Sequence, residues 1–330
     1  MPRVAIVFTG GTITMRSDPA AGGRIPTLDG AALLARVAGL DGIAEIVPID
    51  RGLTPASHFT FPELFAIADA VRGAQDDPAI DGVVVVQGTD TIEETSFLLD
   101  LVLDSPRPVV VTGAMRAASD PGEDGPANLR DAVRCAAVPA LRGQGVVVVL
   151  GGSIEAADDV TKTHATALDT FRSLNLGPLG RVEGDRVVVL RRRAGRRHVE
   201  TRRAAERVRL ITAHVAMDGS LVDAALAAGT DGLVVEATGT GNTSAALLEA
   251  CRRAMAAGLP VVLTTRCPAG RASAAYAFPG GGATWVRAGA ILAGYLGGPK
   301  ARVALALGLG AGLDRAGLER LFADPAPDLG

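Results

Sequence analysis

The sequence is poor in cysteine and in net charge, and it has no long apolar run; each shortage excludes a class of protein. Its three cysteines, Cys135, Cys251 and Cys267, show no CxxC spacing. An odd number without that spacing argues against a disulfide framework and against a zinc site, and favours a reducing compartment. A formal net charge of −3 gives no electrostatic reason to expect a nucleic-acid partner. No apolar stretch reaches membrane-spanning length without glycine, proline or charge, so we expect no membrane association.

Length and the start of the chain set two further expectations. A chain of 330 residues is longer than one hydrophobic core usually spans, which favours two domains. A strand-like run begins at Val4 and leaves no space for the regions of a secretory signal. We therefore expect a cytoplasmic protein.

The chain does contain short β-branched apolar runs, each followed by threonine, glycine and other small residues. The runs VAIVF, VVVV, PVVV and VVVVL begin at residues 4, 83, 108 and 146. Uninterrupted runs of this kind are typical of parallel strands buried on both faces. Helical patterns after Leu64 and Thr95 alternate with them, which indicates βαβ organisation. Because a parallel sheet binds its ligand outside the carboxyl ends of its strands, we expect the small-residue clusters to converge on one site.

The pattern breaks over residues 186–209, where seven arginines lie between residues 191 and 203. Interspersed glutamates and the lack of aromatic residues favour a solvated linker over an arm that binds nucleic acid. Strand-like runs then return. We expect a two-domain α/β fold, with a larger parallel-rich sheet flanked by helices over residues 1–185 and a smaller α/β domain over residues 210–330.

Two of the clusters carry candidate catalytic hydroxyls. In TGGT, paired glycines give a tight exit from the strand, and Thr12 presents a hydroxyl beside backbone N–H groups. On its own, this tetrapeptide fits an ordinary glycine-rich turn with a capping threonine better. QGTDT adds Thr89 next to the carboxylate of Asp90, a composition that can activate a nucleophile and hold a substrate ammonium group. Asp90 could equally cap a helix, with Glu93 completing a capping box.

A hydroxyl needs a base to become a good nucleophile, and histidine is the usual one. None of the four histidines stands in a recognisable triad motif. Lys162, in the segment DVTKTHATALDTFRS, is the better candidate. A lysine desolvated between an aspartate and a threonine can accept a proton from that hydroxyl.

Six motifs along the chain resemble the signatures of the bacterial-type L-asparaginase family. They are TGGTI, GTDTIEET, GAMR, DGPANL, DVTKTHATALDTFRS and GPLG, beginning at residues 9, 88, 113, 124, 159 and 177. The resemblance continues through GTGN at residue 239 and PKARVALALGL near Lys300, and so covers most of the chain. One such motif is weak, but six in order at family-like separations identify a family.

The resemblance implies an amidohydrolase that converts L-asparagine to L-aspartate and ammonia through a threonine acyl-enzyme. It also implies a homotetramer of intimate dimers, and a reaction that needs no metal or organic cofactor. By position, Thr12 matches the nucleophile. Thr89, Asp90 and Lys162 match the group that activates a hydroxyl or water.

The resemblance also implies a set of substrate contacts. Backbone N–H groups in the turns of Gly11 and Gly88 would form the oxyanion hole, and Asp90 would hold the substrate amine. Ala114 would offer its carbonyl to the side-chain amide. Ser57 would bind the α-carboxylate, and Asn242 matches a position that completes the neighbouring subunit's site.

Three departures from the family pattern lie where the substrate is held. The lid normally carries a tyrosine, whereas this chain has Arg24 or Ile25 there and no tyrosine before Tyr276. Ala56 replaces one of two adjacent polar residues that grip the α-carboxylate. The loop 272–282 contains no acidic residue, although periplasmic members place one there.

The loss of one charge-assisted hydrogen bond costs roughly 1.5–3 kcal/mol, so asparagine affinity could fall by one or two decades unless Arg24 replaces that contact.

L-asparagine is the leading substrate, and a different asparagine-like amide is the alternative. Two other classes are a non-catalytic amino-acid-binding homologue, such as an amidotransferase partner subunit, and a nucleotide-binding protein. Intact Thr12, Thr89, Asp90 and Lys162 argue against the first. Neither GTGN nor LGLGAG completes a dinucleotide or P-loop motif, which argues against the second.

Overall fold

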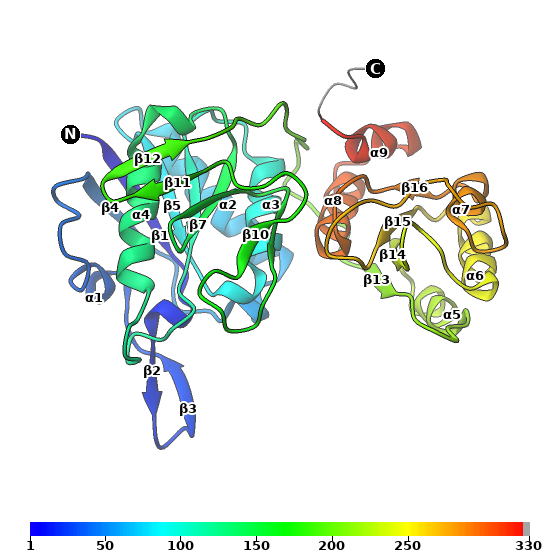
Figure 1. The fold of residues 1–330 in the computed structure, drawn as a ribbon, viewed down its shortest axis with the longest axis horizontal. Coiled ribbons are helices and arrows are strands. Elements are labelled where there is room, and N and C mark those ends of the chain that lie inside the picture. Colours follow the sequence, from blue (N-terminus) through cyan, green and yellow to red (C-terminus); the bar gives the residue numbers. More distant parts are fainter. Residues whose placement is uncertain (326–330) are drawn as a thin grey trace. The chain divides into compact units, whose positions relative to one another are not determined.

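A computed structural model describes residues 1–325, and the chain divides into two units, Met1–Arg196 and Arg197–Gly330 (Figure 1). Each unit is built around its own sheet, eight-stranded in the first and four-stranded in the second. The prediction of an α/β fold with a larger parallel-rich N-terminal sheet and a smaller C-terminal α/β part is therefore confirmed.

The sheet of the first unit has the strand order β12-β11-β8-β7-β6-β5-β1-β4. Neighbouring strands from β4 to β7 are parallel. The four runs predicted as buried parallel strands are four of these, and no residue of β5, β6 or β7 is exposed. The parallel strands are β1 (Arg3–Phe8), β4 (Glu45–Asp50), β5 (Gly82–Val86), β6 (Val109–Thr112) and β7 (Val146–Leu150). The strands β8 (Ser153–Ala156), β11 (Gly180–Glu183) and β12 (Arg186–Val189) extend the sheet in antiparallel fashion.

Helices cover both faces of this sheet, because alternate side chains of its strands point to opposite faces. Ile6 and Phe8 of β1 share one core cluster with Leu129 and Val133 of α4 (Gly125–Ala137). The short helix α1 (Gly30–Leu34) adds Leu33 to that cluster. Figure 1 shows α4 on one side of the sheet, with α2 (Phe61–Asp76) and α3 (Ile92–Val102) on the other.

Smaller elements lie around the carboxyl ends of the parallel strands. A hairpin of β2 (Met15–Asp18) and β3 (Gly23–Pro26) follows β1, and β9 (Val160–Lys162) pairs with β10 (Phe171–Ser173) in a separate two-stranded sheet. Short 3₁₀ turns at these ends are η1 (Thr12–Thr14), η2 (Ala56–His58) and η3 (Thr89–Thr91), whereas η4 (Pro139–Leu141) precedes the start of β7.

The second unit has a parallel sheet of order β13-β14-β15-β16. Its core packs Trp285 of α7 and Cys251 of α6 against Val235 and Leu263 of the sheet. Helix α8 contacts β13, β14 and β15, and α9 packs on α8. The elements are β13 (Val208–Thr212), α5 (Ser220–Ala227), β14 (Gly232–Ala237), α6 (Ala245–Ala256), β15 (Val261–Thr265), α7 (Gly282–Ala288), β16 (Ile291–Leu292), α8 (Gly298–Gly310) and α9 (Arg315–Phe322). No helix within residues 1–325 is long and apolar enough to cross a membrane.

The arginine-rich segment is not the solvated stretch that its composition predicts. Residues 186–189 form β12, and the side chains of Arg193 and Arg197 are only 4% and 6% exposed. Both bind carboxylates, and Arg197 also donates to the carbonyl of Leu321 at 3.0 Å. For Arg193 and Arg197 the prediction was wrong, whereas Arg192, Arg202 and Arg203 are exposed as predicted. Charge without apolar periodicity does not distinguish a solvated face from buried ion pairs.

Candidate active site

The candidate hydroxyls lie on the two sides of a topological switch point. From β1 the chain moves to β4 on one side, and then returns to β5 on the other side of β1. Ligands of such sheets bind in the crevice beyond the carboxyl ends of the two strands that flank the switch. Thr12 follows β1 in η1, and Thr89 follows β5 in η3. The topology therefore directs both hydroxyls to the same crevice.

Direct backbone contact between two glycines brings these turns together. Gly11 has φ +100°, and a Cβ placed on it would lie 2.2 Å from Gly88 N. A side chain at residue 11 is thus excluded both by conformation and by space. Thr9 anchors the same pair of strand ends, because its backbone N–H and its Oγ1 both donate to Val86 O at 3.0 Å.

Lys162 meets the second hydroxyl and the neighbouring carboxylate. Its Nζ donates to Thr89 Oγ1 at 2.9 Å and to Asp90 Oδ1 at 2.8 Å. The Lys162 side chain is 15% exposed and that of Asp90 is 73% exposed. An amine in this position can take the hydroxyl proton when it is neutral, while the exposed carboxylate can receive a cationic group from solvent.

Asp90 does not form the capping box that its spacing from Glu93 suggests. The residue that precedes α3 is Thr91, which makes no side-chain cap hydrogen bond. Glu93 instead accepts a hydrogen bond from Thr161 Oγ1, one residue before Lys162. The predicted capping box does not form because two residues of β9 bind its carboxylates: Lys162 binds Asp90, and Thr161 binds Glu93.

The loop after β6 is held in place next to Thr89 by a motif whose role is not evident from the sequence. Asp124 accepts hydrogen bonds from the backbone N–H groups of Met115 and Arg116 at 3.0 and 2.8 Å. Asn128 Nδ2 donates to Gly113 O at 3.0 Å. Ala114, predicted to present its carbonyl to substrate, lies fully buried within this pinned loop.

The predicted α-carboxylate contact lies beside the same turn. Ser57 is exposed in η2, and Ala56 before it is 5% exposed. Thr91 Oγ1 donates to Ala56 O at 3.0 Å and so ties η2 to η3. Ser57 is therefore presented from a fixed turn at the edge of the crevice.

Of two further predicted residues, Arg24 is paired elsewhere and Asn242 lies in the other unit. Arg24 lies on β3, and its Nη2 is paired with Asp120 Oδ2 at 2.5 Å. Asn242 belongs to the second unit, in a tight bridge with Thr238. Its buried Oδ1 has no hydrogen-bond partner among residues 1–325. Within the same part of the chain, no group of three or more His, Cys, Asp or Glu side chains could hold a metal ion.

Comparison with known proteins identifies a family for each part of the chain. The family model "Asparaginase, N-terminal" matches residues 3–195, and "Glutaminase/Asparaginase C-terminal domain" matches residues 207–322. A probable L-asparaginase of Deinococcus radiodurans is 38% identical over 328 residues, which cover 98% of this chain and 97% of that protein. An L-asparaginase of Bacillus licheniformis is 33% identical over 308 residues, 92% of this chain and 94% of that protein.

A solved structure shares the whole fold. The crystal structure of a probable cytoplasmic L-asparaginase from Campylobacter jejuni matches with a TM-score of 0.87 at 28% identity, over 98% of this chain and 99% of that one. With two family models that together span most of the sequence, and with relatives similar from end to end, this chain belongs to the bacterial-type L-asparaginase family.

Proposed function

We propose that this enzyme hydrolyses L-asparagine to L-aspartate and ammonia through an acyl-enzyme on Thr12. The observation that carries the proposal is the contact of Lys162 Nζ with both Thr89 Oγ1 and Asp90 Oδ1, next to the glycine contact that joins the Thr12 and Thr89 turns. A hydroxyl with a hydrogen-bonded base, on a turn that touches the turn of a second hydroxyl, suits acyl transfer in two steps.

In the first step Thr12 Oγ1 attacks the carbon of the side-chain amide, and a C–O bond forms as the C–N bond breaks. The threonine proton passes to the leaving nitrogen, which departs as ammonia. In the second step water attacks the ester and transfers its proton through Thr89 toward Lys162. The C–O bond to Thr12 then breaks, and Thr12 Oγ1 takes the proton back from Lys162 by the same route. Backbone N–H groups at Gly11 and Gly88 would stabilise the oxyanion, where each such donor is worth about 10²–10³ in kcat.

Each remaining polar group of the substrate would bind a residue of complementary charge or hydrogen-bonding type. The exposed Asp90 carboxylate would bind the α-ammonium group, Ser57 the α-carboxylate, and the Ala114 carbonyl the side-chain amide. Since Ala56 offers no polar group, the carboxylate is held by fewer donors, and we expect modest affinity for asparagine. This favours a second candidate, hydrolysis of a different asparagine-like amide by the same chemistry.

We further propose a homotetramer, a dimer of dimers, in which Asn242 completes the site of the neighbouring subunit. The unsatisfied Oδ1 of Asn242 supports a partner for it outside the single chain.

A cytoplasmic location fits the cysteine usage, because two of the three thiols are free and buried and the third is free and exposed.

The proposal is tested by ammonia release from L-asparagine, with L-glutamine and D-asparagine alongside. We expect Thr12→Ala to abolish release and Lys162→Met to lower steady-state release about 10²- to 10⁴-fold after the first turnover, while Arg192→Ala, which removes an exposed hydrogen bond to Ala140 O, leaves it unchanged. Mass spectrometry of acid-quenched enzyme should detect an aspartyl adduct that Lys162→Met retains longer and Thr12→Ala never forms. Release of ammonia by folded Thr12→Ala would contradict the proposal. A folded wild type that releases none from asparagine would favour a different amide.

A further inference from the structure

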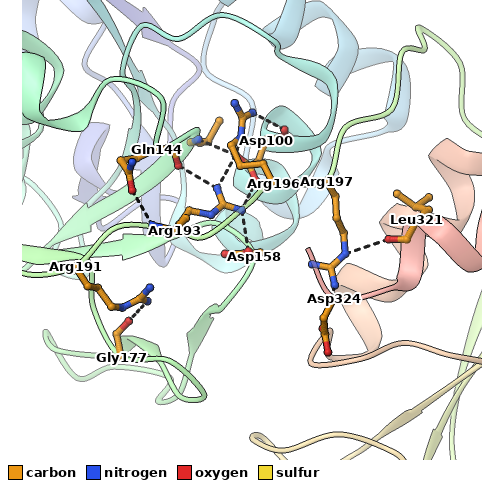
Figure 2. Close-up of polar contacts among 11 residues, drawn as sticks. Asp100, Gln144, Asp158, Gly177, Arg191, Arg193, Arg196, Arg197, Leu321 and Asp324 are labelled. Carbon is orange, nitrogen blue, oxygen red and sulfur yellow. Dashed lines mark hydrogen bonds and ion pairs between the residues drawn. The ribbon is translucent and has the colours of Figure 1, made fainter. Parts of the chain in front are cut away.

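A buried ion cluster outside the site joins the end of the first unit to the segment that carries Lys162. Figure 2 shows Arg193 between Asp100 of α3 and Asp158. Arg193 Nη2 lies 2.8 Å from Asp100 Oδ2 and 2.8 Å from Asp158 Oδ2. The side chains of the three residues are 4%, 1% and 14% exposed.

The arginine is held as a cation. Burial by itself lowers the pKa of Arg193, but the neighbouring carboxylates of Asp100 and Asp158 outweigh it and raise the pKa above its usual value. A planar guanidinium can bind two carboxylates at once in a fixed geometry, which a lysine cannot do. The cluster is therefore a rigid junction.

The two acids depend on Arg193 to different degrees. Asp100 also accepts from Arg196 Nε at 3.2 Å and from Val146 N at 2.9 Å. Asp158 has one oxygen on Arg193, and its other oxygen has no partner among the described residues. Loss of Arg193 would leave Asp100 bound and Asp158 without its cation.

Asp158 lies four residues before Lys162, and side chains attach the whole intervening segment to its surroundings. Thr161 binds Glu93 of α3, and Lys162 binds Thr89 and Asp90 just before α3. Arg193 makes the corresponding attachment to α3 at the opposite end, through Asp100. The segment 158–162 is thus fastened along α3 at both ends.

These attachments are needed because β9 has little support of its own. It consists of three residues and pairs only with β10, in a sheet of two strands. A sheet of two short strands is marginally stable without further packing. The position of Lys162 Nζ therefore depends on side-chain anchors as well as on the tie between β10 and the main sheet, where Ser173 N donates to Glu155 Oε2 of β8 at 3.1 Å.

We propose that Arg193 is a positioning residue for the reaction, and that through Asp158 it holds β9 so that Lys162 Nζ stays within hydrogen-bond distance of Thr89 Oγ1. The inference rests on the proposed function of Lys162 as proton acceptor. It adds a residue of the arginine-rich segment that binds Asp100, Asp158 and Gln144 rather than Thr89 or Lys162, and that acts on the reaction through the placement of the lysine.

The first test is steady-state kinetics of Asp158→Asn, which keeps the shape of the side chain and removes its charge. Small displacements of a catalytic group can cost up to about 10²-fold, so we expect kcat for asparagine to fall about 10- to 100-fold. The ratio kcat/KM should change less than about twofold, because Lys162 acts in the second step and the groups that bind substrate lie on other elements. Asp185→Asn is the matched control, since Asp185 is 89% exposed and pairs with Arg134 at the surface.

A second measurement reports how accessible the Lys162 amine is, independently of enzyme activity. The sequence contains two lysines, Lys162 and Lys300, and Lys300 is 5% exposed in α8. Trace acetylation with acetic anhydride, followed by mass spectrometry, should show a higher rate at Lys162 in Asp158→Asn than in wild type. The rate at Lys300 should stay the same and serves as the internal reference for the reagent dose and for an intact second unit. An unchanged rate at Lys162 would overturn the inference.

A double variant separates this inference from the proposed function. If Asp158 acts through Lys162, Asp158→Asn should cause no further loss in a Lys162→Met background, whereas independent effects would multiply and contradict the proposal. Wild-type activity in Lys162→Met alone would instead refute the role of the lysine, and acetylation of Asp158→Asn would still report whether the cluster holds Lys162 in place.

If Asp158→Asn does not fold, Arg193→Lys keeps a buried cation without the two-carboxylate geometry, and the same results are expected.

Discussion

At the scale of single residues, the site depends on a glycine that allows two strand ends to touch. Gly11 combines φ +100° with a backbone contact to Gly88, so an alanine there meets both a conformational and a steric penalty. Only glycine both adopts this positive φ readily and leaves space for the Gly88 backbone. Fewer residue types are therefore tolerated at position 11 than at position 12, which supplies the hydroxyl.

We therefore expect Gly11→Ala to lower the free energy of unfolding by about 2–5 kcal/mol, from about 1–2 kcal/mol for the left-handed conformation and about 1–3 kcal/mol for overpacking. Activity should fall at least about 10²-fold, because the Thr12 and Thr89 turns must separate. Urea unfolding and ammonia release measure the two effects. The control is Gly52→Ala, with φ +90° and no atom within 4 Å of the added Cβ. Equal losses of activity in both variants would show that the contact with Gly88 is unimportant.

At the scale of elements, the helices that cover the sheets bury small side chains, including two thiols. Burial raises the pKa of Cys135 in α4 and of Cys251 in α6 from 9.0 to about 12. The folded protein then binds more protons than the unfolded chain between about pH 9 and 12. The contribution of these thiols to stability is complete below about pH 9 and is lost as the pH rises toward 12, at up to about 1.4 kcal/mol per thiol and pH unit.

The same burial predicts selective labelling. In native protein at pH 8, iodoacetamide should modify Cys267, which is exposed, and leave Cys135 and Cys251 unmodified. Unfolding in urea should make all three react, which serves as the positive control. Rapid modification of either buried thiol in native protein would mean that α4 or α6 opens readily, contrary to their packing in the two cores.

At the scale of the whole molecule, the proposed sharing of sites between subunits predicts complementation. Thr12→Ala and Asn242→Ala should each be inactive or nearly so. When the two are unfolded together and refolded, half of the random dimers are mixed, and each mixed dimer has one site with both native residues. Activity should then recover to about a quarter of the wild-type value. If Asn242 acts within its own chain, no mixed dimer has an intact site and mixing restores nothing. Refolded wild type gives the reference yield.

Local composition was sufficient to predict those elements whose conformation depends mainly on residues adjacent in the chain. Continuous β-branched runs identified β1, β5, β6 and β7, because a strand buried on both faces needs an apolar residue at every position. Glycine and threonine after those runs marked the strand ends that carry Thr12 and Thr89. Ordered motifs then identified the family, which implied the roles of Asp90 and Lys162.

Contacts between charged groups far apart in the sequence were not predictable in this way. Glu93 has the spacing of a capping residue but binds Thr161, 68 residues further on. Arg193 has the composition of a solvated linker but is buried against Asp100, 93 residues earlier. The sequence by itself determined the buried parallel strands and the glycine-rich turns after them, since apolar burial and turn conformation are local properties, and its motifs predict the reacting groups. Only the tertiary structure decided which carboxylate pairs with which cation, because that choice depends on which elements the fold brings together.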